Sequence, residues 1–223
     1  MTTLITDSLP DQRVFLHNVS WDTYMRLMED QASSSSPRFT YDNGALEIMT
    51  PLAIHERINR GLQVLVDCVA VEFDIEVDSL GSTTFSRRDL AQGFEADSCF
   101  YVQHESAVRG KDRIDLNVDP PPDIVLEIEI TRGSLPKLPI FEQFEVPEVW
   151  RYEGSQVIIL ILDQEQSRDA RPDGAGYHSV ECSRAFPMIT TGALTQAVAR
   201  INAQSRTGWV REAREFAKAL RAG

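Results

Sequence analysis

The stretch PPDIVLEIEIT, residues 121–131, decides how this chain folds. Isoleucine, valine and leucine dominate it, which is typical of a strand that is buried on both faces of a sheet. Three carboxylates, Asp123, Glu127 and Glu129, nevertheless lie within it. Side chains two residues apart point to the same face of a strand. One face is therefore acidic apart from Val125, while isoleucine and leucine form the opposite face.

The acidic face needs a charge partner, because a buried carboxylate loses its hydration and neighbouring carboxylates repel one another. A second acid, Asp97, stands at the entrance of the strand expected within GFEADSCFYVQ, residues 93–103. A divalent cation would relieve the repulsion, and oxygen ligands suit Mg²⁺ or Mn²⁺. The alternative is an edge strand whose acids face solvent and keep it soluble. The apolar remainder of the strand and the second acidic strand favour a site.

The segments around this strand predict a mixture of helices and strands. AIHERINRGLQVLVDCVAVEF, residues 53–73, carries apolar residues every three or four positions, as in an amphipathic helix. Asp42-Asn43-Gly44 predicts a hairpin turn, and VWRYE and QVIILILD form a second hairpin joined at Gly154. SLPKLPIFEQF, residues 134–144, reads as a short helix or turn, and an amphipathic helix closes the chain. We predict a flexible leader over residues 1–13 and one α/β (α+β) domain over residues 14–223, with a central mixed sheet flanked by helices.

Composition limits the class of function. The chain has 223 residues, a net charge of −12 and a pI of about 4.8, which disfavours backbone-wide DNA binding but allows a local basic patch. Its three cysteines form no CxxC pair, so we expect a reducing cytoplasm and neither a disulfide framework nor a zinc site. No apolar run approaches the roughly 20 residues that cross a bilayer, so we expect no membrane association.

At this point the sequence resembles a known family. The segments EADSCFYVQ, PPDIVLEIEIT and LPKLPIFEQFEVPEVWRY together resemble the Uma-two-type family of restriction endonucleases, within the PD-(D/E)XK nuclease superfamily. The resemblance runs from YDNGALEIMTPLAIHERIN to VPEVWRY, about half of the chain. It implies a restriction-endonuclease-like core, a Mg²⁺ or Mn²⁺ cofactor and a DNA substrate.

The resemblance also implies roles for individual residues. Glu56 is the acid from a helix, Asp97 the strand acid and Glu127 the acid of the next strand, and all three would hold metal or its waters. The superfamily's Glu-x-Lys lysine falls on Glu129, which is a departure. Lys137, preceded by proline where the family has aspartate, would replace that lysine from the following helix. His55, beside Glu56, is expected at the surface.

Three readings stay open at this point. The first is a metal-dependent endonuclease that hydrolyses DNA phosphodiester bonds. The second is a catalytically silent member of the same fold that acts as a binding or assembly module, which the missing lysine and the acidic pI allow. The third is a hydrolase of another phosphoester. Because two DNA strands need two sites, we also expect a homodimer, with the VIILILD strand and the C-terminal helix as its interface.

Overall fold

The computed structural model describes residues 12–31, 36–130, 134–163 and 176–222. Its helices are α1 Trp21–Asp30, α2 Ala53–Phe73, α3 Glu105–Val108, α4 Leu138–Gln143, α5 Thr191–Ala203 and α6 Arg206–Ala222. Its strands are β1 Gln12–Leu16, β2 Arg38–Asp42, β3 Ala45–Thr50, β4 Asp78–Ser79, β5 Thr84–Arg87, β6 Gln92–Glu95, β7 Ser98–Tyr101, β8 Ile124–Glu129, β9 Glu148–Glu153, β10 Gln156–Leu162 and β11 Tyr177–Val180.

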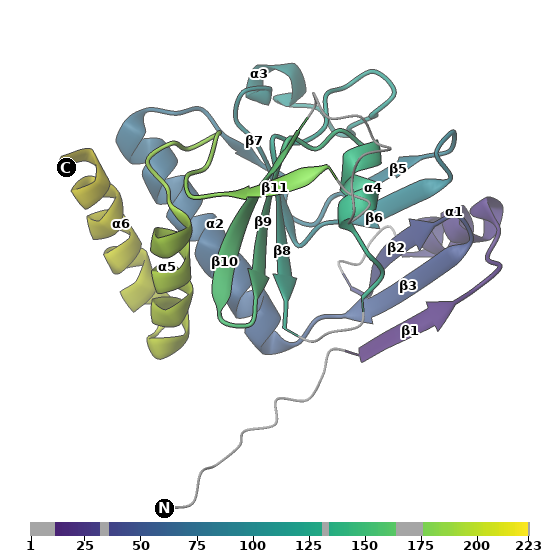
Figure 1. Ribbon diagram of the computed structural model, residues 1–223, viewed down its shortest axis with the longest axis horizontal. Helices are drawn as coiled ribbons and strands as arrows, with labels where there is room; N and C mark the ends of the chain where they lie inside the picture. Colours follow the sequence, from purple (N-terminus) through teal and green to yellow (C-terminus); the bar gives the residue numbers. More distant parts are fainter. Residues whose placement is uncertain (1–11, 32–35, 131–133, 164–175, 223) are drawn as a thin grey trace, which may run out of the picture.

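These strands form two sheets (Figure 1). The first has the order β1-β3-β2-β6-β5, and the second has the order β11-β10-β9-β8-β7-β4. Every pair is antiparallel except β8 with β9, which run parallel and are connected through α4. The expectation of a mixed sheet flanked by helices is therefore confirmed.

The second sheet lies between two apolar layers (Figure 1). One face of β8, made of Ile124, Leu126 and Ile128, packs in the core that includes α2, α5 and α6. The opposite face contributes Val125 to a second core, which contains residues of β5, β6 and α4. Strand β8 is thus buried on both faces, as its composition predicted.

Helix α2 has the bounds that its periodicity predicts, because one continuous apolar face packs on the sheet. Its close approach to the C-terminal helices depends on Gly61, whose carbonyl accepts a hydrogen bond from the Trp209 indole at 2.9 Å. In the first sheet, Asn43 and Gly44 both take positive φ, as the turn of the predicted β2–β3 hairpin requires.

Three expectations about elements were wrong. GFEADSCFYVQ contains two strands and not one: β7 begins directly after Asp97, as expected, but β6 before it belongs to the first sheet, and Ala96 and Asp97 connect the two. The leader was expected to reach residue 13, but β1 already begins at Gln12, and residues 1–11 lie outside the described part. The VIILILD strand lies inside the sheet, between β9 and β11, so its backbone is not a free interface.

Candidate active site

The site lies where the two sheets meet. Ser98 pairs with Leu126 in the antiparallel β7–β8 ladder, and continuing this register by one residue sets Asp97 beside Glu127. The carboxylates of both residues are buried, with 1% and 9% of each residue exposed. The chain therefore places side by side two of the three acids that were predicted as metal ligands.

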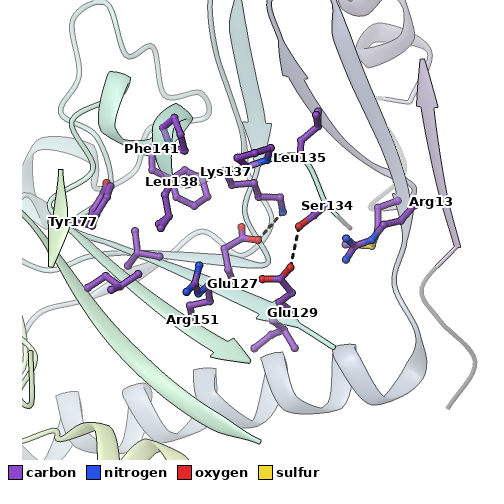
Figure 2. Close-up of a pocket in the computed structure, with 16 residues that line it drawn as sticks. Arg13, Glu127, Glu129, Ser134, Leu135, Lys137, Leu138, Phe141, Arg151 and Tyr177 are labelled. Atoms are coloured by element: carbon purple, nitrogen blue, oxygen red, sulfur yellow. Dashed lines mark hydrogen bonds and ion pairs between the residues drawn. The ribbon is translucent and has the colours of Figure 1, made fainter. Parts of the chain in front are cut away.

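Lys137 is the charge partner of Glu127. It stands directly before α4, and its Nζ lies 2.6 Å from Glu127 Oε2 (Figure 2). Burial raises the pKa of Glu127, while the Lys137 ammonium acts in the opposite direction. The second carboxylate oxygen, Oε1, is buried and has no hydrogen-bond partner. Only one of the two carboxylate oxygens of Glu127 therefore has a hydrogen-bond partner in the protein.

Asp97 has different partners. Its Oδ2 accepts a hydrogen bond from the backbone N–H of Ile128 at 2.6 Å, and its Oδ1 forms an ion pair with Arg38 of β2. The backbone on either side is held as well, because Asn59 of α2 donates to the Asp97 carbonyl at 2.8 Å and accepts from the Ser98 hydroxyl. These contacts from three elements fix the position of Asp97.

Arg38 also contacts Glu56, the acid on helix α2. Arg38 Nη2 lies 2.5 Å from Glu56 Oε1, so one guanidinium bridges Glu56 and Asp97. Arg38 is 5% exposed. Arg38 was not among the residues predicted for the site. A lone arginine at the start of a strand rich in buried side chains was the available signal.

His55 was expected at the surface, and this is wrong. Its side chain is fully buried, with Nε2 3.2 Å from Asp97 Oδ2. Burial, together with the positive charges of Arg38, Lys137 and Arg13, lowers the pKa of His55 to about 3. The imidazole is therefore neutral at physiological pH.

The other two acids of the β8 segment go to different places. Asp123 does not join Glu127: it accepts hydrogen bonds from the backbone of Val102 and His104 at 2.7 and 3.0 Å, and so anchors the loop after β7. Glu129 lies on the Glu127 side of the strand and accepts a hydrogen bond from the Ser134 hydroxyl at 3.1 Å (Figure 2).

A cavity of about 440 Å³ opens beside Glu127 and Glu129. Arg13, Lys137 and Arg151 contribute positive charge to its wall, and Arg151 is the parallel-ladder neighbour of Glu127 (Figure 2). Asp97 and Glu56 line a separate hollow of about 470 Å³, together with Arg38. The acids are thus divided between two concave regions, with Glu127 and Glu129 lining one and Asp97 and Glu56 lining the other.

A divalent cation fits this donor set. Among the described residues, no group of three or more His, Cys, Asp and Glu side chains is arranged around one point. Mg²⁺, however, is commonly held by one or two carboxylates, with water and substrate phosphate completing its shell. Asp97 and Glu127 are such a pair, and the unpartnered Oε1 of Glu127 supplies an open oxygen ligand. These two residues would hold the cation.

None of the helices in the described ranges is both long and apolar enough to cross a membrane. No curated protein matches the chain in sequence. Among solved structures, it is similar to a protein described as a putative nuclease belonging to DUF820 from Anabaena variabilis ATCC 29413, with 13% identity and a TM-score of 0.48 over 81% of this chain and 99% of that one. The family model Uma2, described as "Putative restriction endonuclease", matches residues 21–197. The chain therefore belongs to the Uma2 family of restriction-endonuclease-like proteins.

Proposed function

We propose that this protein is a Mg²⁺- or Mn²⁺-dependent endonuclease that hydrolyses phosphodiester bonds in DNA. The observation that carries the proposal is the pairing of two buried acids, Asp97 and Glu127, on adjacent strands, with Lys137 Nζ at 2.6 Å from Glu127. Membership of the Uma2 family supports the same class of reaction.

Each residue has a distinct role in this proposal. Asp97 and Glu127 hold the divalent cation, which when bound neutralises phosphate charge and lowers the pKa of an attacking water. The Lys137 ammonium stabilises negative charge as it develops on the phosphate, because a fixed cation in a site with little water acts strongly on that charge. Glu129 belongs to the same site and lines the cavity beside Glu127.

The positive charges in the wall of the cavity next to Glu127 suit the phosphates of one nucleic-acid strand. Arg13, Lys137 and Arg151 supply cations for phosphate, although the whole chain is acidic. This local patch is what allows a protein with a net charge of −12 to act on DNA.

The test is nicking of supercoiled plasmid by the metal-stripped protein after addition of Mn²⁺ or Mg²⁺. We expect nicking by the wild-type protein and at least a 100-fold loss in Asp97→Asn and Glu127→Gln, since each removes a charged ligand. Glu215→Gln on α6 is the matched control, because Glu215 is exposed and pairs only with Lys218 among the contacts described. Normal folding with no nicking under either metal would instead favour a catalytically silent binding module.

A further inference from the structure

Arg38 holds two of the site's acids through one side chain. Its guanidinium bridges Glu56 of α2 and Asp97 of the β6–β7 connection, although Arg38 itself belongs to β2. A guanidinium keeps its charge at every pH a folded protein meets. Arg38 is therefore a permanent cation at the position where these two carboxylates converge.

The oxygens of both acids already have partners from the chain. Glu56 Oε2 lies 3.6 Å from Arg60 Nε, and Asp97 Oδ2 accepts the Ile128 N–H. Asp97 Oδ1 has no hydrogen bond but is ion-paired with Arg38, whereas Glu127 Oε1 is buried with neither a hydrogen bond nor an ion pair among the described contacts, because Lys137 binds only the other oxygen. The unfilled acceptor of the site is thus on the Glu127 side.

We propose that Arg38 is a built-in counter-cation that occupies the space between Glu56 and Asp97, so that the protein binds one divalent cation, between Asp97 and Glu127, and not a second one between Asp97 and Glu56. Two-metal sites hold their cations about 3.5–4 Å apart between shared carboxylates. Here a second cation would have to displace the guanidinium from Asp97 or bind against its charge. This inference rests on the proposed function and specifies how many metal ions that site takes.

The proposal gives Glu56 a different role from a metal ligand. Glu56 becomes a positioning residue, because its carboxylate holds the Arg38 guanidinium in contact with Asp97. Its side chain is about one-third exposed, so replacing it by glutamine leaves no buried charge of its own. Glu56→Gln can therefore be tested in a folded protein.

The experiment is a Mn²⁺ titration of the metal-stripped full chain without DNA, in which electron paramagnetic resonance counts free Mn²⁺. We expect one equivalent per wild-type chain and at least tenfold weaker binding in Glu127→Gln. Glu56→Gln should keep one equivalent with a Kd within twofold of wild type. Arg38→Met should bind a second equivalent, whereas Arg60→Gln, which removes the exposed arginine beside Glu56, should not.

The outcomes separate this inference from the proposed function. Two equivalents in the wild type, a tenfold weakening in Glu56→Gln, or a folded Arg38→Met that still binds one equivalent would each overturn the counter-cation role while leaving a metal site. No Mn²⁺ binding by the wild type would overturn both proposals. If circular dichroism shows that Arg38→Met does not fold, the wild-type stoichiometry and Glu56→Gln decide the question.

Discussion

At the scale of single residues, the site is a buried network in which charges are matched across elements that are distant in sequence. Asp97 forms an ion pair with Arg38, and Glu127 forms one with Lys137. A third buried acid, Glu47, accepts a hydrogen bond from the Leu135 N–H at 2.6 Å. Buried ion pairs of this kind contribute little net stability, but removing one partner is costly because the other charge stays buried. The network therefore fixes the positions of the acids more than it stabilises the fold.

His55 makes the network sensitive to acid. Its folded pKa of about 3 lies below its usual value of 6.5, so below pH 6.5 the unfolded chain takes up a proton that the native protein excludes. Stability should then fall by about 1.4 kcal/mol per pH unit from this group, or about 2 kcal/mol between pH 7 and pH 5. Arg38, Lys137 and Arg13 disfavour the imidazolium, and Asp97, which faces it at 3.2 Å, is itself paired with Arg38.

Urea unfolding at pH 7 and pH 5 measures this loss of stability. We expect the loss of unfolding free energy on acidification to be about 2 kcal/mol smaller in His55→Gln than in the wild type. Burial raises the pKa values of Glu95 and Glu127, which has the opposite effect on the pH dependence, but both groups remain in the variant. Equal pH dependence in the two proteins would show that His55 is protonated in the native state.

At the scale of elements, the site depends on how α2 is held against the C-terminal helices. Gly61 makes this close packing possible: a Cβ at this position would lie 2.5 Å from the Ile201 side chain of α5. Gly61→Ala should therefore overpack the α2–α5 contact and destabilise the protein by about 1–3 kcal/mol. Thermal and urea unfolding measure this change.

Gly192 provides the matched control, because a Cβ there meets nothing closer than 3.8 Å. Gly192→Ala lies in the first turn of α5 and should be neutral or should stabilise the protein by up to about 1 kcal/mol. If both alanines had the same effect, helix propensity and not packing against Ile201 would account for the change.

The elements also show what the sequence could and could not predict. The bounds of α2 follow from periodicity, and Asn43-Gly44 correctly indicated a hairpin, because both signals are local. The break between β6 and β7 was missed, since Ala96 and Asp97 interrupt the apolar pattern without glycine or proline. Such a change of sheet is set by tertiary pairing, with β2 on one side and β8 on the other.

The residues of the candidate site, too, could be predicted from the sequence only in part. The alternation along residues 121–131 correctly indicated that Glu127 and Glu129 share a face of β8, whose bounds are Ile124–Glu129. Asp123 was grouped with them, yet it lies just before β8 and accepts hydrogen bonds from the loop after β7. Arg38 was missed because its contacts with Glu56 and Asp97 join residues 18 and 59 positions apart, which no local pattern reveals.

At the scale of the whole molecule, the net charge of −12 restricts how the protein meets DNA. Only a local patch is available in the proposed site, where Arg13, Lys137 and Arg151 are the cations that line the described cavity. Each phosphate contact contributes about 0.9 to the slope of log K against log salt concentration. We therefore expect a shallow slope, of about −3 or weaker, in fluorescence anisotropy titrations of duplex DNA at a fixed Ca²⁺ concentration.

Arg151→Gln should reduce the magnitude of that slope by about 1, because it removes one of the three cations. Arg60→Gln, in the separate hollow lined by Asp97 and Glu56, should leave the slope unchanged. A wild-type slope of −6 or steeper would show that DNA contacts a larger basic surface than this cavity provides.

The connection between β6 and β7 has a mechanical consequence. Ala96 and Asp97 are the only residues between β6 of the first sheet and β7 of the second, so Asp97 lies at the shortest connection between the two sheets in the described part of the chain. Arg38 ties it to the first sheet, and the Ile128 N–H ties it to the second. A ligand that pushed the two sheets apart would therefore act on the Arg38 ion pair and the Ile128 hydrogen bond of Asp97.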